Sequence, residues 1–405
     1  MNSYISEWLN LALRWFHLVA GISWIGSSFY FMWLDKSLEP PKSGQPGKDT
    51  VEGELWMCHS GGFYQVEKRL IGPGTMPEKL HWFKWEAAFT WLSGIALLAV
   101  VYYLSDSAYL IDPAKTSLNH GQASAIGIAV LITTWFLYDW LWNSKLGKDQ
   151  PGISLALCLA VTAAVSWWLS QLFTGRGAFL HVGAMFGTIM VLNVWVRILP
   201  AQQQMIDATK AGRTPDYALG KAAKRRSVHN SYMTLPVLFI MISNHFPSTY
   251  SGPLNWVVLL LMTFVGGGIR HMQIVGTRRV AWLGIPVAAA LIAAIMIGAP
   301  RRNASVQNSQ QDAGAAPPPK FAQVWAIIQD RCTTCHSQKP TDDVFTVAPA
   351  GMMFDDPRTV QAFAARIKFR AVESHTMPFG NKTNITQEER DILGRWVDAG
   401  ASITE

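Results

Sequence analysis

Apolar residues gather in eight long runs along the first three quarters of the chain. The runs cover residues 9–34, 83–104, 121–142, 152–173, 178–199, 228–246, 253–271 and 280–299. Each run is long enough as a helix to cross a bilayer core that is about 30 Å thick. The first run is too long and too aromatic for a cleaved signal peptide. The pattern therefore predicts an all-α fold, a polytopic membrane bundle of about eight transmembrane helices within residues 1–299.

The pattern changes after the last run. Residues 300–320 are rich in Asn, Ser, Gln, Ala and Pro, and they predict a flexible linker that ends in a stiffer proline run. The final part, residues 321–405, contains an amphipathic segment, Thr386–Ala399, in which apolar residues recur at helical spacing. These are Ile392, Leu393, Trp396 and Val397. We therefore expect a membrane domain, a linker and a small C-terminal domain.

Composition supports a membrane protein rather than an ordinary soluble enzyme. Half of the residues are hydrophobic and 15% are charged, against about 25% in an average soluble domain. The net charge of +7 would suggest a nucleic-acid partner in a soluble protein. Here the basic residues lie between the apolar runs, where they indicate membrane topology, so we predict contact with a lipid bilayer and no nucleic-acid partner.

The distribution of Lys and Arg predicts how the chain crosses the bilayer. The odd-numbered connections between runs hold 16 of these residues, and the even-numbered ones hold two, Lys115 and Arg176. Because basic connections favour the cytoplasmic side, the N-terminus and the C-terminal domain are expected on the periplasmic side of a bacterial inner membrane. Arg301 and Arg302, just after the last run, oppose this trend without outweighing it.

A Cys-Thr-Thr-Cys-His sequence lies near the start of the C-terminal domain. Cys332 and Cys335 have the spacing that forms two thioether bonds to a haem, and the adjacent His336 then lies under the iron. The same short motif also occurs by chance and in zinc or redox sites. Covalent haem attachment takes place outside the cytoplasmic membrane, which agrees with the side that the basic residues predict.

The order of elements in this domain resembles class I cytochromes c. A helix-like segment precedes the motif, and a Met-Pro pair at Met377 lies between the motif and the final amphipathic segment. The resemblance implies one covalent haem c whose iron is bound by His336 and Met377, a pair that raises the haem potential. Met352 and Met353 remain alternatives for the sixth ligand.

Ionisable and amide side chains inside a bilayer are costly and usually functional. In this chain they fall at two depths. The outer level contains Arg14, His17, His181 and His245. The inner level contains His81, Glu86, Asp139, Asn193, Arg197, His229, Asn230, Arg270 and His271. Each residue alone has an ordinary explanation as a helix cap or helix end. Their common level on five helices predicts a polar pocket that opens to the cytoplasm.

The outer level suggests a second haem. Arg14 and His17 are followed, about seven residues after His17, by Trp-Ile-Gly, and this pattern resembles the first helix of several haem-b membrane proteins. The resemblance implies that His17 binds the iron of a membrane haem b, with His181 at the same level as the preferred second ligand. Arg14, on the same helix face as His17, would pair with a propionate. The alternative is that hydrogen bonds between helices satisfy both histidines.

The first connection, residues 35–82, is unusually long, and long ordered connections are more often functional than not. Its glycines allow close backbone approach, and its aromatic residues offer stacking faces. Cys58 and His59 indicate a metal only weakly, because no second Cys-His pair accompanies them.

Three segments carry a resemblance to a known family. They are HSGGFY in the first connection, LHWFKWEAAFTWLSG at the second run, and RRSVHNSYMTLPVLFIMISNH at the sixth. With the fused cytochrome, the chain resembles the membrane-bound bacterial urate oxidases along almost its whole length. The resemblance implies an oxidoreductase of purine catabolism. It would convert urate to 5-hydroxyisourate and pass electrons to its own haem c and then to a respiratory acceptor.

The inner level contains groups that suit this substrate. Urate is a flat, largely monoanionic purine, so its site needs a cation and amide-type hydrogen-bonding groups. Arg197, or alternatively Arg270, would hold the anion. Asn193 and Asn230 would contact the edges of the ring.

An aromatic face and a base complete the predicted site. Trp82 or Trp85 would stack on the purine, and Glu86 or His229 would take the proton.

An inner site and an outer haem c are separated by much of the roughly 30 Å core, which is too far for useful direct electron transfer. We favour a bridging redox centre at the level of His17 over a substrate site at the outer face.

Two other functions fit the same sequence. The first is a quinol–cytochrome c type electron-transfer membrane protein without purine chemistry, in which the inner pocket binds a quinone. The second is a transporter or a signalling receptor whose cytochrome domain senses redox state. Reduction of the haem by urate and the appearance of an oxidised product would separate these functions from urate oxidation.

Overall fold

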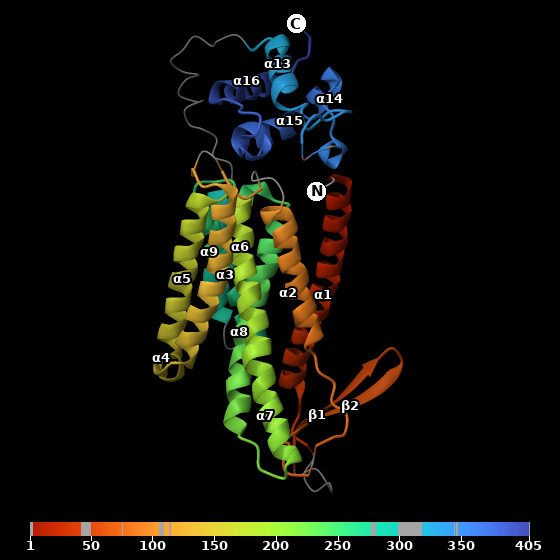
Figure 1. Ribbon diagram of the computed structural model, residues 1–405, viewed down its shortest axis with the longest axis vertical. Helices are drawn as coiled ribbons and strands as arrows, with labels where there is room; N and C mark the ends of the chain where they lie inside the picture. Colours follow the sequence, from red (N-terminus) through yellow and green to blue (C-terminus); the bar gives the residue numbers. More distant parts are fainter. Residues whose placement is uncertain are drawn as a thin grey trace.

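The structure is a computed structural model that describes residues 3–41, 50–74, 76–104, 109–112, 115–276, 281–298, 318–343, 345 and 347–404. Most of the predicted linker lies outside these ranges, as do Arg301 and Arg302. The described chain is mostly helical. Figure 1 shows a bundle of long helices with a small helical domain at one end, beside the N-terminal end of α1.

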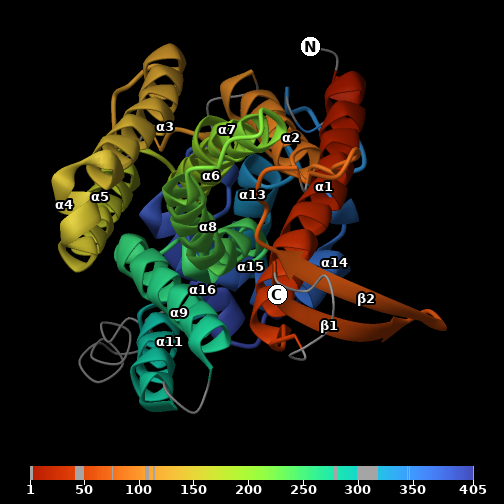
Figure 2. The same cartoon turned by 90° about the horizontal axis from the view of Figure 1, so that it is seen from below.

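The bundle consists of long helices that run up and down its length. They are α1 (Ser3–Ser37), α2 (Trp85–Leu98), α3 (His120–Asn143), α5 (Pro151–Leu172), α6 (Gly175–Leu192), α7 (Leu199–Lys210), α8 (Tyr217–Ser243), α9 (Asn255–Val275) and α11 (Gly284–Gly298). The short α4 (Lys145–Asp149) connects α3 to α5. Two π-helical segments, η1 (Ala99–Tyr103) and η3 (Asn193–Ile198), continue α2 and join α6 to α7. Figure 2 shows α6 and α8 near the middle, with the other helices around them.

Five helical stretches are long and apolar enough to cross a membrane, which supports a multi-pass membrane protein. They are Trp85–Tyr103, His120–Asn143, Pro151–Leu172, Gly175–Lys210 and Asn255–Val275. The other three predicted runs also fall in helices, namely α1, α8 and α11. The total of eight crossings, and the side of the membrane on which each end lies, stay predictions.

Polar side chains at helix starts explain where several of these helices begin. Asn119 forms a capping box at the start of α3. The Thr174 hydroxyl accepts a hydrogen bond from the Gly177 backbone at the start of α6, and Asp216 caps α8. Each side chain satisfies a backbone N–H that has no partner within the first helical turn.

The long first connection departs from the all-α prediction, because much of it folds as a β-hairpin. Strand β1 (Val51–His59) pairs antiparallel with β2 (Gly62–Arg69). The turn places Ser60 and Gly61 at φ of 50° and 77°, and glycine adopts such positive φ values without a steric penalty. Figure 1 shows this hairpin at the end of the bundle away from the C-terminal domain.

The C-terminal domain packs short helices around its own apolar core. Its elements are α13 (Phe321–Arg331), η6 (Pro349–Gly351), α14 (Pro357–Ala362), α15 (Ala364–Ile367), η7 (Lys368–Glu373), η8 (Phe379–Asn381) and α16 (Gln387–Asp398). Leu393 and Trp396 of α16 are buried, as the helical spacing predicted. Glu389 joins the capping box of α16 and accepts hydrogen bonds from Arg331, which ties α16 to α13.

Small residues let the central helices approach closely. A Cβ atom built on Gly266 of α9 would lie 2.8 Å from Cδ of Pro236 in α8, whereas one built on Gly267 would meet nothing within 4 Å. Helices in membranes commonly associate through such glycines. The backbones of α8 and α9 are therefore in contact at Gly266.

We predict that Gly266→Ala destabilises the protein by about 1–3 kcal/mol, the usual range for an overpacked core position. Its methyl group would force α8 and α9 apart. Thermal unfolding of the detergent-solubilised protein measures the effect. Gly267→Ala is the matched control, and equal melting temperatures for the two variants would contradict the packing.

Candidate functional site

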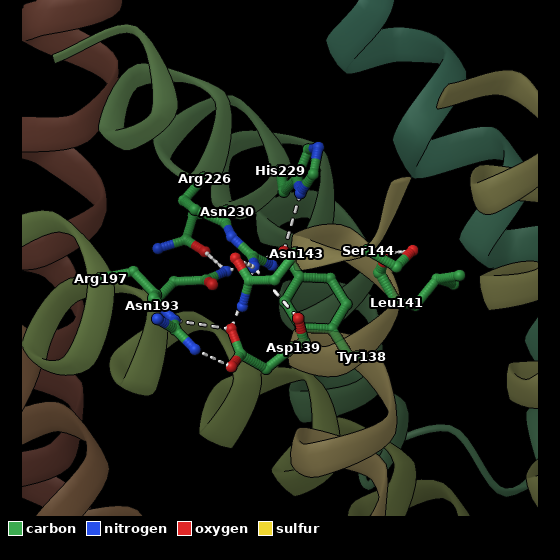
Figure 3. A network of polar contacts seen from close by, with 10 residues as sticks. All are labelled: Tyr138, Asp139, Leu141, Asn143, Ser144, Asn193, Arg197, Arg226, His229 and Asn230. Atoms are coloured by element: carbon green, nitrogen blue, oxygen red, sulfur yellow. Dashed lines mark hydrogen bonds and ion pairs between the residues drawn. The ribbon is translucent and has the colours of Figure 1, made fainter. Parts of the chain in front are cut away.

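A cluster of polar side chains connects α3, η3 and α8 inside the bundle, and Figure 3 shows how its members point toward one another. We call it the Asp139 network. It consists of Tyr138, Asp139, Asn193, Arg197, Arg226, His229 and Asn230. The sequence placed five of these residues at one level of the bundle, and the structure brings those five together.

The carboxylate of Asp139 balances two guanidinium groups. Arg197 donates from Nε to Oδ1 at 2.8 Å and also contacts Oδ2 through Nη2. Arg226 donates from Nη2 to Oδ1 at 2.9 Å. The Arg226 side chain is 4% exposed and that of Arg197 is 40% exposed. Because two cations share one anion, the cluster keeps one excess positive charge, and Arg197 is its accessible part.

Tyr138 connects the charged pair to the amide groups. Its hydroxyl lies 2.7 Å from Nδ1 of His229 and accepts a hydrogen bond from Nδ2 of Asn193 at 3.0 Å. Nδ2 of Asn193 also donates to Oδ1 of Asn230 at 2.9 Å. Asn193 is fully buried, yet its Oδ1 has no hydrogen-bond partner among the described residues. A buried acceptor of this kind is suited to a donor that arrives with a ligand.

Local backbone structure positions these groups. Asn193 begins and Arg197 nearly ends the π-helical segment η3, and π-helical turns inside α-helices are frequent at functional sites. The Arg226 guanidinium lies 5.0 Å from the centre of the Tyr138 ring, within the range of a cation–π contact. Together these contacts fix the relative positions of α3, α8 and η3 at this level.

Sequence reasoning missed Tyr138 and Arg226. Tyr138 lies inside an apolar run, where it resembles an ordinary core aromatic. Arg226 falls in a basic connection, where its charge was assigned to topology. The only signal for Arg226 was its place one helical turn before Asn230, on the same face of a helix.

The other inner-level residues lie outside the Asp139 network. Arg270 donates from Nε to the Ser231 hydroxyl at 2.7 Å, and its guanidinium lies 3.9 Å from the ring centre of Phe29. His271 pairs through Nδ1 with the Tyr232 hydroxyl at 2.6 Å. These residues form a second cluster on α8 and α9. Arg270 therefore lies in a separate cluster, where its Nη2 is buried without a hydrogen-bond partner among the described residues, and it stays the alternative to Arg197 as the anion-binding residue.

Glu86 lies in the first turn of α2, and its Oε2 is buried without a partner among the described residues. The neighbouring Trp85 ring packs edge-on, at 5.6 Å between centroids, against Trp195 of η3. Lys84 lies over the rings of Trp82 and Trp85. The start of α2 is therefore next to η3, the segment that carries Asn193 and Arg197.

His81 and Trp82 line a separate, largely apolar pocket of about 250 Å³. Its other wall is formed by α7, including Gln202 and Met205. The pocket lies between the segment after the hairpin and α7. His81 and Trp82 therefore belong to a neighbouring surface and are not members of the Asp139 network.

The two histidines predicted to bind a membrane haem b both make hydrogen bonds between or within helices. Nε2 of His181 lies 2.9 Å from the Tyr103 hydroxyl and Nδ1 lies 2.8 Å from the Gly177 carbonyl oxygen. Nδ1 of His17 lies 3.0 Å from the Thr90 carbonyl oxygen. His181 is fully buried and both of its ring nitrogens are hydrogen-bonded in this packing, whereas only Nδ1 of His17 has a hydrogen-bond partner among the described residues.

Arg14 likewise has a local partner, since its Nε donates to Asn10 one turn earlier on the same helix. The hydrogen bonds of His17 and His181 correspond to the alternative that the sequence left open, in which contacts between helices satisfy both rings. The haem b that would bridge the Asp139 network and the C-terminal cavity stays a prediction.

A cavity of about 300 Å³ in the C-terminal domain is lined by Cys332, Cys335, His336 and Met377. Nδ1 of His336 lies 3.0 Å from the Met352 carbonyl oxygen, so its other nitrogen is left for a metal. Burial lowers the pKa of His336, although its hydrogen bond to Met352 opposes the shift, and a neutral imidazole is the form that binds iron. These residues fit a covalently bound haem c.

The fold and these sites define a multi-pass helical membrane protein with a buried polar network inside its bundle. The model of the family described as urate oxidase N-terminal matches residues 3–299, and the chain belongs to that family. Membership implies an oxidoreductase of purine catabolism whose substrate is urate. Comparison with curated proteins and with solved structures gives no match.

We predict that Asp139→Asn lowers the free energy of unfolding by about 3–5 kcal/mol, because it leaves the buried Arg226 charge without its partner. Thermal unfolding in detergent measures the loss. Asp149→Asn, at an exposed position at the end of α4, is the matched control. A melting temperature for Asp139→Asn equal to that of the control would show that Asp139 does not balance Arg226.

Proposed function

We propose that this chain oxidises urate to 5-hydroxyisourate at the Asp139 network. We further propose that residues 321–405 form a cytochrome c domain, which takes up the electrons and delivers them to a respiratory acceptor. The family match supports urate as the substrate. We choose this site because the Asp139 network has an excess positive charge next to Oδ1 of Asn193, a buried amide oxygen without a hydrogen-bond partner among the described residues.

The charge of the Asp139 network suits the substrate. Urate near neutral pH is largely a monoanion, and the two guanidinium groups exceed the single carboxylate by one charge. Arg197 is exposed enough to reach a ligand, while Arg226 stays buried and holds Asp139 in place. Oδ1 of Asn193 would accept a hydrogen bond from a ring N–H of the purine.

The reaction needs a base as well as a binding site. Urate and one water give 5-hydroxyisourate, two protons and two electrons, and the water oxygen becomes the new hydroxyl on the ring. Glu86 is the better base of the two candidates, because its buried carboxylate oxygen is unbonded, whereas Nδ1 of His229 already pairs with Tyr138. His229 would then orient Tyr138 and, through it, Asn193.

The C-terminal cavity supports the electron-accepting half of the proposal. Cys332 and Cys335 would hold a haem c through thioether bonds, and His336 and Met377 would bind its iron. When bound, the haem supplies a one-electron acceptor, so each urate requires two transfers. His336 is oriented for this role by its hydrogen bond to the Met352 backbone.

Purified protein mixed with urate should show reduction of the haem c absorbance and formation of 5-hydroxyisourate or its decay products. Prompt reduction by a quinol without reduction by urate would favour the quinol–cytochrome c function. Binding or transport of urate without any product would favour a transporter or a receptor. A pyridine haemochrome spectrum of the same sample counts haem c and any haem b.

Three substitutions test the site. Arg197→Ala should weaken urate binding about 10- to 100-fold, the range for a hydrogen bond to a charged group. Glu86→Gln should slow urate-dependent reduction about 10²- to 10⁴-fold, the range for a lost general base. His229→Ala should also impair reduction, and all three should keep the haem c spectrum. Arg213→Ala, at an exposed position between α7 and α8, is the control, and full activity in all three variants would place the site elsewhere.

Met377→Ala should leave the haem covalently attached but change its sixth ligand and lower its potential. Absorbance spectra and a redox titration measure both effects. Met353→Ala, at an exposed position, serves as the control. An unchanged Met377→Ala spectrum would mean that another residue is the sixth ligand. Met352, which also lines the cavity, would then be the next residue to test.

A further inference from the structure

The cavity of the C-terminal domain is completed by residues of the bundle. Tyr109, before α3, and Arg176, in the first turn of α6, line the same cavity as the Cys-Thr-Thr-Cys-His segment. The Tyr109 ring lies 4.3 Å from the ring of Phe379 and 6.3 Å from that of Phe345, between centroids. The two domains therefore share one cavity.

Hydrogen bonds to other bundle residues hold both Tyr109 and Arg176 in place. The Tyr109 carbonyl accepts a hydrogen bond from the Thr174 hydroxyl at 2.8 Å. Arg176 donates from Nε to Oδ1 of Asn244, at the end of α8, at 2.9 Å. The Arg176 guanidinium also lies 5.5 Å from the centre of the Tyr109 ring. The connections at this end of the bundle thus hold a fixed cation at the cavity wall.

The cavity gathers positive charge. Its lining includes four arginines, Arg176, Arg331, Arg366 and Arg370. Arg331 pairs with Glu389, but the other three form no ion pair with a carboxylate among the described residues. Such cations around a mostly apolar cavity fit a flat apolar ligand that carries carboxylates, and the two propionates of a haem are such carboxylates.

The nearby Tyr250, between α8 and α9, is affected by the charges of both domains. Burial raises its pKa, while the charges of Arg176 and Arg370 act in the opposite direction. Arg176 from the bundle and Arg370 from the C-terminal domain therefore lie close to one phenol. This agrees with a shared patch of positive charge at the junction.

We propose that Arg176 of the membrane domain completes the haem site of the C-terminal domain by pairing with a haem propionate. A cation at this position disfavours the oxidised haem, which carries one more positive charge than the reduced form. The membrane domain would therefore help to set the potential of its own electron acceptor. The inference rests on the proposed haem c and does not depend on the urate chemistry.

A redox titration of the full-length, haem-loaded protein tests this role. Arg176→Gln keeps much of the side chain but removes the charge, and it should shift the reduction equilibrium about tenfold toward the oxidised haem, or ~59 mV. Arg176→Lys should restore most of the wild-type potential, because it returns the charge. Arg213→Gln is at an exposed position in the connection between α7 and α8, which Figure 1 shows at the end of the bundle away from the C-terminal domain, and it should leave the potential unchanged.

A wild-type potential in Arg176→Gln, with an intact haem c spectrum, would overturn the role of Arg176. If that variant does not accumulate, Asn244→Leu removes the hydrogen bond that anchors Arg176 and should shift the potential in the same direction, by less. No shift in Asn244→Leu would also overturn the inference. Absence of covalent haem from the wild-type protein would instead overturn the proposed cytochrome function.

Discussion

A buried guanidinium group in an apolar helix bundle is the constraint on which the site depends. Arg226 lies on α8, almost without exposure, and its charge requires a carboxylate at hydrogen-bond distance. Asp139 on α3 provides that carboxylate and also pairs with Arg197 of η3. Because the three groups fix three helical segments at one level, the neighbouring Tyr138 and Asn193 meet in a defined arrangement instead of facing separate parts of the bundle.

The position of this network along the bundle sets the distance that electrons would cross under the proposed function. Asp139 lies near the far end of α3, about 28 Å along the helix from His120 at 1.5 Å per residue, and His120 begins α3 at the end nearer the C-terminal domain (Figure 1). His181 and His17, which lie between these levels, are engaged in hydrogen bonds. The contact of Tyr109 with Phe379 joins the bundle to the C-terminal domain, so the separation is confined to the bundle itself.

Individual residues show how far the sequence could predict the site. Asp139 and Arg197 stood out because charges inside apolar runs are costly and need a reason. Arg226 did not stand out, because it lies among basic residues in a connection. Tyr138 did not stand out either, because a tyrosine suits a helix core whether or not its hydroxyl is bonded. The pairing of His181 with Tyr103 was equally hidden, since the two residues come from different helices.

The sequence by itself determined the class of structure. Long apolar runs require helices in a membrane, and the Cys-Thr-Thr-Cys-His spacing predicts a haem on a separate domain, since both follow from local pattern. Only the tertiary structure decided which polar groups meet and that the first connection is a hairpin. It also decided that Arg176 and Tyr109 face the C-terminal cavity. These features depend on how helices distant in sequence rotate and pack against one another, and a periodic pattern along one helix does not specify that rotation.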